Sequence, residues 1–156
     1  MLELAFASLA WRSAPMPGAG PVEMALLPRL PDSGFRAFVR FPAGWSRPDR
    51  GHYAVPEEFL VLEGELSLNG RNWRAGDLAW VPAWQLRRDL QSAPGCLVFA
   101  WFGGTPRWLP GAPAARPGDG PAHRTSIEGR ELVRLLPGAV RETLNLDDYT
   151  WRATPA

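Results

Sequence analysis

The 156-residue sequence contains no lysine, one cysteine and two histidines. A single cysteine, Cys96, excludes an intrachain disulfide and suits a reducing compartment, so we expect a cytoplasmic protein. The formal net charge is +1, which provides no field of one sign to attract nucleic acid or an anionic membrane. All 17 basic residues are arginine, a pattern that codon bias in a GC-rich bacterial genome produces.

The sequence also lacks an apolar run long enough to cross a membrane. Residues 1–11 are apolar, but they are too few for a span, contain Glu3 and lack the basic leader of a signal peptide. With 17 prolines and 16 glycines, long helices are disfavoured and short strands joined by turns are favoured. A chain of this length has enough residues for one domain with a real core.

Local patterns predict several strands of this domain. Glu57–Leu68 alternates clearly, and Gly64 within it is expected to bend the strand where a barrel turns a corner. Asn69-Gly70 predicts a two-residue hairpin, because both residues accept a positive φ. Cys96–Phe102 is an unbroken apolar run, which is typical of a strand buried on both faces.

The organisation predicted from these patterns has four parts. They are an N-terminal arm (1–21), a barrel core (22–105), a connection rich in proline and glycine (106–125), and C-terminal strands and tail that complete the barrel (126–156). Within the last part, residues 126–136 fit one further strand or a short helix. Residues 139–146 alternate as a final strand.

Two segments resemble the two signature motifs of the cupin superfamily. In Glu-Glu-Phe-Leu-Val-Leu-Glu-Gly-Glu-Leu, six residues separate Glu57 from Gly64; in Arg-Ala-Gly-Asp-Leu-Ala-Trp-Val-Pro-Ala, five separate Gly76 from Pro82. Together with residues 95–99 and the flanking Trp-Pro segments, they are most similar to ChrR-like and acetylacetone-dioxygenase-like bacterial cupins. The resemblance implies an all-β, single-domain jelly-roll barrel, or double-stranded β-helix, with an N-terminal arm and a C-terminal extension.

Cupins typically hold one iron, manganese, zinc or nickel ion with three histidines and a glutamate. The resemblance places Glu57 on that glutamate and Arg87 on the histidine of the second motif. The two histidines of the first motif fall on Arg50 and His52 if four residues separate them from Glu57, and on Gly51 and Tyr53 if three residues do. Two protein ligands rarely hold a catalytic ion, and a guanidinium repels one. We therefore expect no metal cofactor. The alternative is one divalent ion held by His52, Glu57 and a third ligand.

In place of the ion, we expect Arg87 to face Glu57 as an internal ion pair. The role of Glu57 in this pair is either structural or catalytic, because a buried carboxylate needs a partner for both. A slip of one residue would instead turn Arg87 outward with Arg88. His52 is interpreted equally as a functional residue or as a half-buried strand residue with a backbone partner. His123 is interpreted as a solvated loop residue.

These residues favour a protein that binds a small organic, anionic molecule inside the barrel, between aromatic walls. The predicted ligand-binding residues are Arg50, Glu57, Trp84, Gln85 and Arg87. The alternative is an enzyme, either a metal-dependent dioxygenase or a metal-free isomerase or cyclase. Its catalytic residues would be His52, Tyr53 and Glu57, and in the metal-free enzyme His52 is the base and Tyr53 the acid. A barrel with a purely structural role is the third hypothesis. The resemblance also implies a homodimer, and we expect neither nucleic acid nor membrane as a partner.

Overall fold

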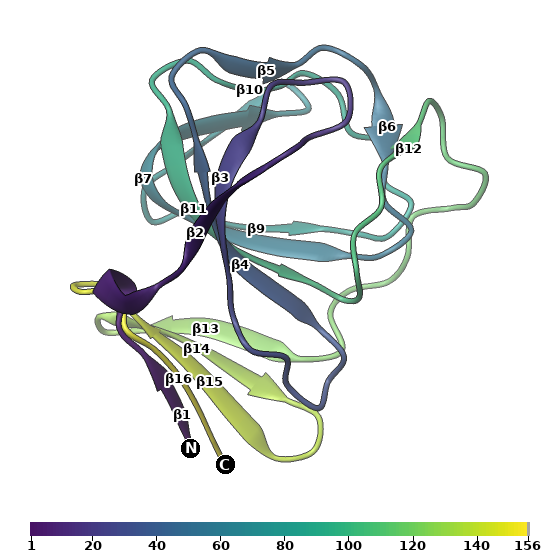
Figure 1. The fold of residues 1–156 in the computed structure, drawn as a ribbon. Coiled ribbons are helices and arrows are strands. Elements are labelled where there is room, and N and C mark those ends of the chain that lie inside the picture. The colour runs from purple at the N-terminus through teal and green to yellow at the C-terminus, as the bar shows by residue number, and fades with distance from the viewer. Residues whose placement is uncertain (156) are drawn as a thin grey trace. The chain divides into compact units, whose positions relative to one another are not determined.

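The computed structural model describes residues 1–155 and consists of strands joined by turns and loops (Figure 1). A single 3-10 turn, η1, is the only helical element among these residues, so the predicted all-β architecture is confirmed. In chain order the elements are β1 (Leu2–Leu4), η1 (Phe6–Ser8), β2 (Trp11–Ala14), β3 (Val22–Leu26), β4 (Phe35–Phe41), β5 (Trp45–Arg47), β6 (Gly51–His52), β7 (Glu57–Leu68), β8 (Arg71–Arg74), β9 (Leu78–Val81), β10 (Leu90–Ser92), β11 (Cys96–Phe102), β12 (Leu109–Pro110), β13 (Arg124–Glu128), β14 (Glu131–Leu136), β15 (Val140–Asn145) and β16 (Trp151–Pro155).

The contacts of the chain divide it into two units, 11–120 and the combination of 1–10 with 121–156. The larger unit contains a nine-stranded antiparallel sheet in the order β2-β3-β4-β11-β7-β10-β5, with β8 and β9 also paired to β7. The sheet curls round on itself, so that its two ends approach the same interior (Figure 1). A separate two-stranded ribbon joins β6 to β12.

Strand β7 organises the larger unit, because it pairs with β8, β9, β10 and β11. Its bend occurs at Gly64, which has φ 78° and lies opposite Cys96. The register with β11 shifts between Leu97 and Val98, and this bulge increases the local curvature of the strand. The predicted bend at Gly64 is therefore where the barrel curves.

The Asn69-Gly70 turn joins β7 to β8, with Leu68 opposite Arg71. Both turn residues have positive φ, 54° and 77°, as the predicted two-residue hairpin requires. Strand β11 is buried at all seven positions, as its apolar run predicted. From it Cys96, Val98, Ala100 and Phe102 join the hydrophobic cluster of the larger unit, as the period of two requires.

The smaller unit is a five-stranded antiparallel sheet in the order β1-β16-β15-β14-β13. Its pairings bring the two chain ends together, since Leu2 lies opposite Ala153. Within it, Arg134 Nη1 donates to Glu142 Oε1 at 2.6 Å, and Trp151 Nε1 donates to Glu142 Oε2 at 2.7 Å. Both oxygens of this fully buried carboxylate are thus satisfied, which offsets the cost of removing the charges from water.

The chain ends are arranged differently from the sequence-based organisation. Residues 126–156 were expected to complete the barrel, but β13–β16 pair with one another and with β1. Residues 1–21 were expected to form one arm, yet β1 belongs to the smaller unit and β2 is an edge strand of the nine-stranded sheet. Gly129, with φ 62°, divides residues 126–136 into the hairpin β13–β14 in place of one strand or helix. Antiparallel pairing between sequence neighbours explains the arrangement of β13–β16, and β1 joins them by pairing with β16.

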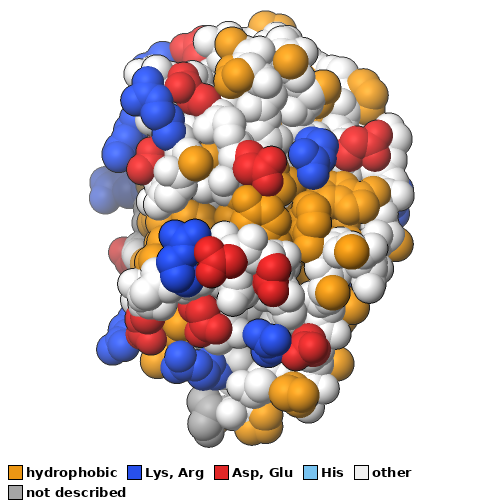
Figure 2. Space-filling model, turned by 90° about the vertical axis from the view of Figure 1, so that its left-hand side faces the viewer, with side chains coloured by type: hydrophobic (Ala, Val, Ile, Leu, Met, Phe, Trp, Pro, Cys, Tyr) orange, Lys and Arg blue, Asp and Glu red, His pale blue; other side chains and the backbone are white. Residues whose placement is uncertain are grey.

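Acidic and basic side chains are interspersed over the face shown in Figure 2. This distribution agrees with the net charge of +1, and it gives that face no extended field of one sign. Among residues 1–155, no helix is long and apolar enough to span a bilayer.

The tight packing behind Gly64 leads to a prediction about stability. A Cβ added at Gly64 would overlap the carbonyl oxygen of Gly95, whereas one added at Gly76 (φ 93°) would meet nothing within 4 Å. Both Gly→Ala changes carry the strain of a positive φ, roughly 1–2 kcal/mol. We expect Gly64→Ala to lower the free energy of unfolding by about 1–3 kcal/mol more than Gly76→Ala, because backbone must also shift. Urea unfolding followed by tryptophan fluorescence measures the difference, and equal losses would contradict the close packing.

Candidate functional site

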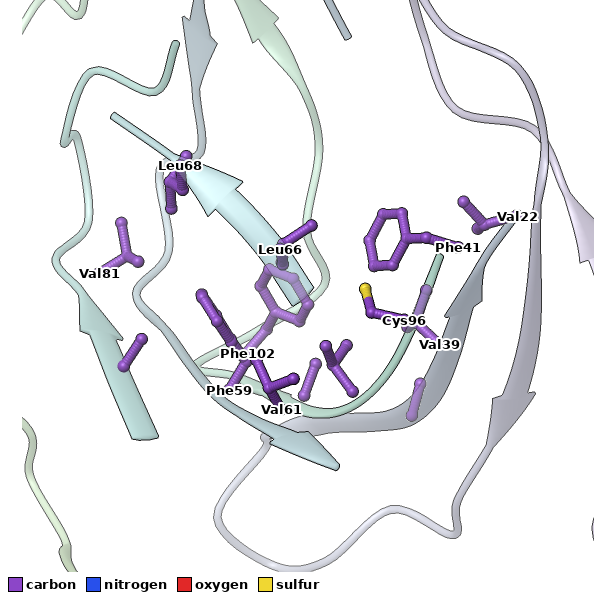
Figure 3. Close-up of a cluster of buried hydrophobic side chains, with 14 of the residues drawn as sticks. Val22, Val39, Phe41, Phe59, Val61, Leu66, Leu68, Val81, Cys96 and Phe102 are labelled. Atoms are coloured by element: carbon purple, nitrogen blue, oxygen red, sulfur yellow. The ribbon is translucent and has the colours of Figure 1, made fainter. Parts of the chain in front are cut away.

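The curled sheet of the larger unit encloses a cavity of about 620 Å³. Its walls are mostly aliphatic and aromatic. Phe41 of β4, Phe59 and Leu66 of β7, and Phe102 of β11 point into the interior (Figure 3). Further lining comes from residues 12, 14–17 and 105–108. The charged residues among the lining side chains are Arg12, Arg47, Glu57, Arg87 and Arg107.

Glu57 and Arg87 meet at this cavity as a buried ion pair. Arg87 Nη1 donates a hydrogen bond to Glu57 Oε1, and both side chains are about nine-tenths buried or more. Glu57 begins β7, whereas Arg87 lies in the loop before β10, where it exchanges two backbone hydrogen bonds with Gly51 of 2.8 and 3.1 Å. The predicted encounter of Arg87 with Glu57 is therefore present, and Arg87 points inward.

The rest of the Arg87 guanidinium has no polar partner in the described part of the chain. Its Nε and Nη2 are buried without a hydrogen bond, and the Tyr53 ring lies 4.7 Å from its Cζ. The ring face therefore replaces part of the lost hydration by a cation–π contact. Tyr53 also lines the cavity, so the structure brings together Tyr53, Glu57 and Arg87 of the predicted site residues.

Arg47 is a lining residue that the sequence analysis missed. Its side chain is buried, and its Cζ lies 3.9 Å from the ring centroid of Trp108 and 6.0 Å from that of Trp45. Its Nε donates to the Pro17 carbonyl at 3.2 Å, while Nη2 makes only a 4.0 Å contact with the Met16 sulfur. Trp45 and Arg47 share a buried face of β5, but the strand has three residues, so no alternation could be recognised in its sequence.

His52, the predicted base of a metal-free enzyme, is not among the residues that line the cavity. Because Tyr53 follows His52 in extended backbone, the two side chains leave opposite faces of the chain. The His52 ring is buried 5.6 Å from the Trp84 ring, and its Nδ1 lies 3.0 Å from the Gly111 carbonyl oxygen. The alternative interpretation, a buried strand residue with a backbone partner, is the one that the structure supports.

Three predicted ligand-binding residues are also absent from the cavity lining. Arg50 is exposed, because it lies in the bend before β6. Trp84 has φ 66°, and its backbone N–H donates to the Tyr53 carbonyl at 2.8 Å, which turns the chain at this point. Gln85 follows in the same turn, with Nε2 3.4 Å from the Leu86 carbonyl. The motif spacing located the correct loop, but the turn directs only Arg87 inward.

The donor groups do not fit the metal centre that the cupin resemblance implies. Among residues 1–155, no three side chains of His, Cys, Asp or Glu gather in a group able to hold an ion. A guanidinium already occupies Glu57, and His52 faces away from the cavity. His123 belongs to the smaller unit and is buried, which corrects its interpretation as a solvated loop residue; it directly precedes β13.

A second ionic cluster lies at the start of β4 and is fully used by the fold. Arg36 donates to both oxygens of Asp32 at 3.0 and 2.7 Å, and Trp101 Nε1 and the Gly34 N–H add bonds of 3.2 and 2.9 Å. Burial acts to raise the pKa of Asp32, but these hydrogen bonds and the Arg36 charge hold it below its usual value. The carboxylate therefore stays ionised and braces the turn, so we assign it a structural role.

Cys96 is buried in the hydrophobic cluster, and its burial raises the pKa of the thiol to about 11, although a hydrogen bond with Ser92 opposes the shift. Only the thiolate is nucleophilic. We therefore expect 5,5′-dithiobis(2-nitrobenzoate) at pH 8 to label the native protein at least about 100-fold more slowly than the protein in 8 M urea. Native labelling at the unfolded rate would show that the thiol is accessible and ionised.

The burial of Glu57 and Arg87 predicts strong coupling between them. Glu57→Leu or Arg87→Met alone leaves a buried charge without its partner and should cost about 3–5 kcal/mol of unfolding free energy. The double variant should recover most of that loss, because two apolar side chains of similar size replace the pair. Urea unfolding of the four proteins gives the coupling energy.

The exposed pair Arg74–Glu65 (2.9 Å) provides a matched control for this cycle, since its arginine side chain is 68% exposed. Its coupling should stay below about 1 kcal/mol, as for other surface ion pairs. A Glu57–Arg87 coupling no larger than that of the control would contradict the geometry described for the cavity.

Comparison with known proteins supplies structural likenesses only. No family model matches the sequence, and no curated protein sequence matches it either. A proposed acetylacetone dioxygenase from Methylibium petroleiphilum PM1 has a TM-score of 0.60 and 19% identity, with 72% of this chain and 84% of that chain covered. An RmlC-like cupin from Ralstonia eutropha JMP134 has a TM-score of 0.54 and 20% identity, covering 67% and 69%.

The complex of Rhodobacter sphaeroides SigE with the anti-sigma factor ChrR is also similar. Its TM-score is 0.51 at 24% identity, and the match covers 62% of this chain and 50% of the matched chain in the complex. Identities this low show the fold and do not transfer an activity. Together with the two sequence motifs and the curled antiparallel sheet, they establish that the chain has the fold of the cupin superfamily.

Proposed function

We propose that this protein binds a small organic anion in the interior of its barrel. The observation that carries the proposal is the cavity of about 620 Å³, whose mostly apolar lining contains four arginines and one glutamate. This volume lies within the range of small-molecule sites, which combine apolar walls with a few polar groups. The excess of guanidinium over carboxylate groups selects the sign of the ligand's charge.

The polar groups of the cavity are arranged to orient a ligand. Arg12 and Arg107 are exposed at the lining, so water screens their charges, whereas Arg47 and Arg87 are buried. Buried guanidiniums bind carboxylate or sulfonate oxygens more strongly, because the apolar surroundings lower the local dielectric. An anion with an apolar body therefore fits this lining better than a neutral or cationic molecule.

The enzyme alternatives lack a supporting observation. An acid–base reaction with His52 as base is not proposed, because its ring lies outside the lining. Metal-dependent dioxygenase chemistry is not proposed either, because the donor groups of residues 1–155 do not gather as an ion requires. The homodimer and the cytoplasmic location stay predictions from the sequence.

Filling the cavity should abolish binding. The fluorescent anion 1-anilinonaphthalene-8-sulfonate is a suitable probe, since it joins one sulfonate to an apolar body. Ala100 lines the cavity and is buried, so Ala100→Leu and Ala100→Phe should weaken the binding of the probe progressively, by at least about 10-fold for the larger change. Fluorescence titration measures the affinity, and circular dichroism verifies that each variant is folded.

Ala93→Phe is the matched control, because Ala93 is exposed and absent from the lining. It should bind the probe as the wild type does. Absence of saturable 1:1 binding by the wild type, or equal binding by the folded Ala100→Phe variant, would overturn the proposal.

A further inference from the structure

Arg47 and Arg87 are both buried at the cavity, but their charges are balanced differently. Arg87 is neutralised by Glu57. Within residues 1–155, Arg47 has no carboxylate within ion-pair distance, and its polar contacts are the Pro17 carbonyl and the Met16 sulfur. Arg47 is nevertheless only 1% exposed. It is thus the buried cation of this cavity that has no counterion.

Leaving a cation buried in this way is unfavourable, and the fold reduces the cost with an aromatic face. The indole of Trp108 lies 3.9 Å from the Arg47 Cζ, close enough for a cation–π contact between desolvated groups. The contact stabilises the charge without neutralising it. An anion that entered the cavity would supply the missing counter-charge, and the guanidinium would retain donors to bind it.

The backbone fixes Trp108 in this position. The ribbon β6–β12 pairs Gly51 with Pro110, and the Trp108 ring packs so closely on Gly51 that an added Cβ would overlap it. The Tyr53 ring meets the Trp108 ring edge-on, with centroids 5.4 Å apart, and carries Arg87 on its face. Arg47, Trp108, Tyr53 and Arg87 thus form a continuous cation–aromatic wall.

The rest of the lining indicates the chemistry of the part of the ligand that does not contact the arginines. Apart from the cation–aromatic wall, Glu57 and the exposed arginines, the lining is almost entirely apolar. Examples are Val39, Phe41, Val98 and Phe102, which belong to the buried hydrophobic cluster. A ligand that satisfies both parts has one charged end and a compact aliphatic or aromatic body.

We propose, on the basis of the anion binding proposed above, that Arg47 stacked on Trp108 holds the head group of an organic monoanion. The ligand class is a monocarboxylate or monosulfonate with an apolar body, and Arg87 remains paired with Glu57. A single charge is specified because the buried part of the lining carries two guanidiniums and one carboxylate, a net charge of one.

The test compares two probes that differ only in the charged group. 1-Anilinonaphthalene-8-sulfonate carries the sulfonate, and N-phenyl-1-naphthylamine is the same body without it. Their dissociation constants are measured by fluorescence titration for the wild type, Arg47→Met, Arg47→Lys and Arg87→Met. Arg50→Met is the control, because Arg50 is exposed and absent from the cavity lining.

We expect Arg47→Met to weaken the sulfonate probe about 30-fold or more, because it removes the desolvated partner of the anion. The neutral probe should bind this variant at least as well as it binds the wild type, which also verifies that the cavity is intact. Arg47→Lys should bind the sulfonate with intermediate affinity, since it keeps the charge without the planar stack. Arg50→Met should leave both affinities unchanged.

The outcomes separate the two proposals. If Arg47→Met binds both probes as the wild type does while Arg87→Met loses the sulfonate selectively, the inference about Arg47 is wrong and anion binding stands. Equal losses of both probes in Arg47→Met would make Arg47 a structural residue and would also overturn the inference. If the wild type binds neither probe, anion binding itself fails.

Discussion

The buried ion pair between Glu57 and Arg87 is the contact on which the interior of this barrel depends. Its surroundings are mostly apolar, so each charge needs the other as its partner. Glu57 starts β7 and Arg87 lies in the loop before β10, so their contact fixes the start of the central strand against that loop. The same loop exchanges backbone hydrogen bonds with Gly51, which fixes the strand segment that leads to Tyr53. Separating the two charges would expose each of them to a medium of low dielectric, at a cost of several kcal/mol. The positions of Tyr53 and, through the β6–β12 ribbon, of Trp108 therefore depend on this contact.

The pair also determines which charge is available to a ligand. In a cupin with a metal ion, the positive charge at this place depends on the ion and on deprotonated ligands. The positive charge of a guanidinium belongs to the side chain itself, so it needs no cofactor. Because Glu57 neutralises the charge of Arg87, the net positive charge of the buried lining comes from Arg47. One arginine is thus paired within the fold, and the other is the one that we propose to bind the anion.

Local sequence patterns predicted the parts of this structure that depend on neighbouring residues. The alternation of Glu57–Leu68, the Asn69-Gly70 turn and the apolar β11 each follow from a period of two or from a required positive φ. The encounter of Glu57 with Arg87 followed from the spacing of the cupin motifs. The sequence could not show whether His52 or Tyr53 points into the cavity, because a shift of one residue exchanges the two faces of a strand. The sequence also could not show with which strands β13–β16 pair, because an alternating pattern predicts a strand but not the sheet edge that it joins. Arg47 was missed because β5 has three residues, too few for an alternation to be recognised, and because its aromatic partner Trp108 comes much later in the chain.

The absence of lysine shows how composition and site are related. Codon bias accounts for the number of arginines, but it does not account for where they lie. An ammonium group at position 47 would be more strongly hydrated and could not stack its plane on an indole, so its burial without a counterion would be less favourable. A guanidinium spreads its charge over a flat surface, which lets Trp108 cover one face while an edge keeps donors for oxygen atoms. The chemistry of Arg47 is therefore specific to arginine whatever caused the composition, and a buried, stacked and uncompensated guanidinium is the feature that distinguishes this cavity from an ordinary hydrophobic core.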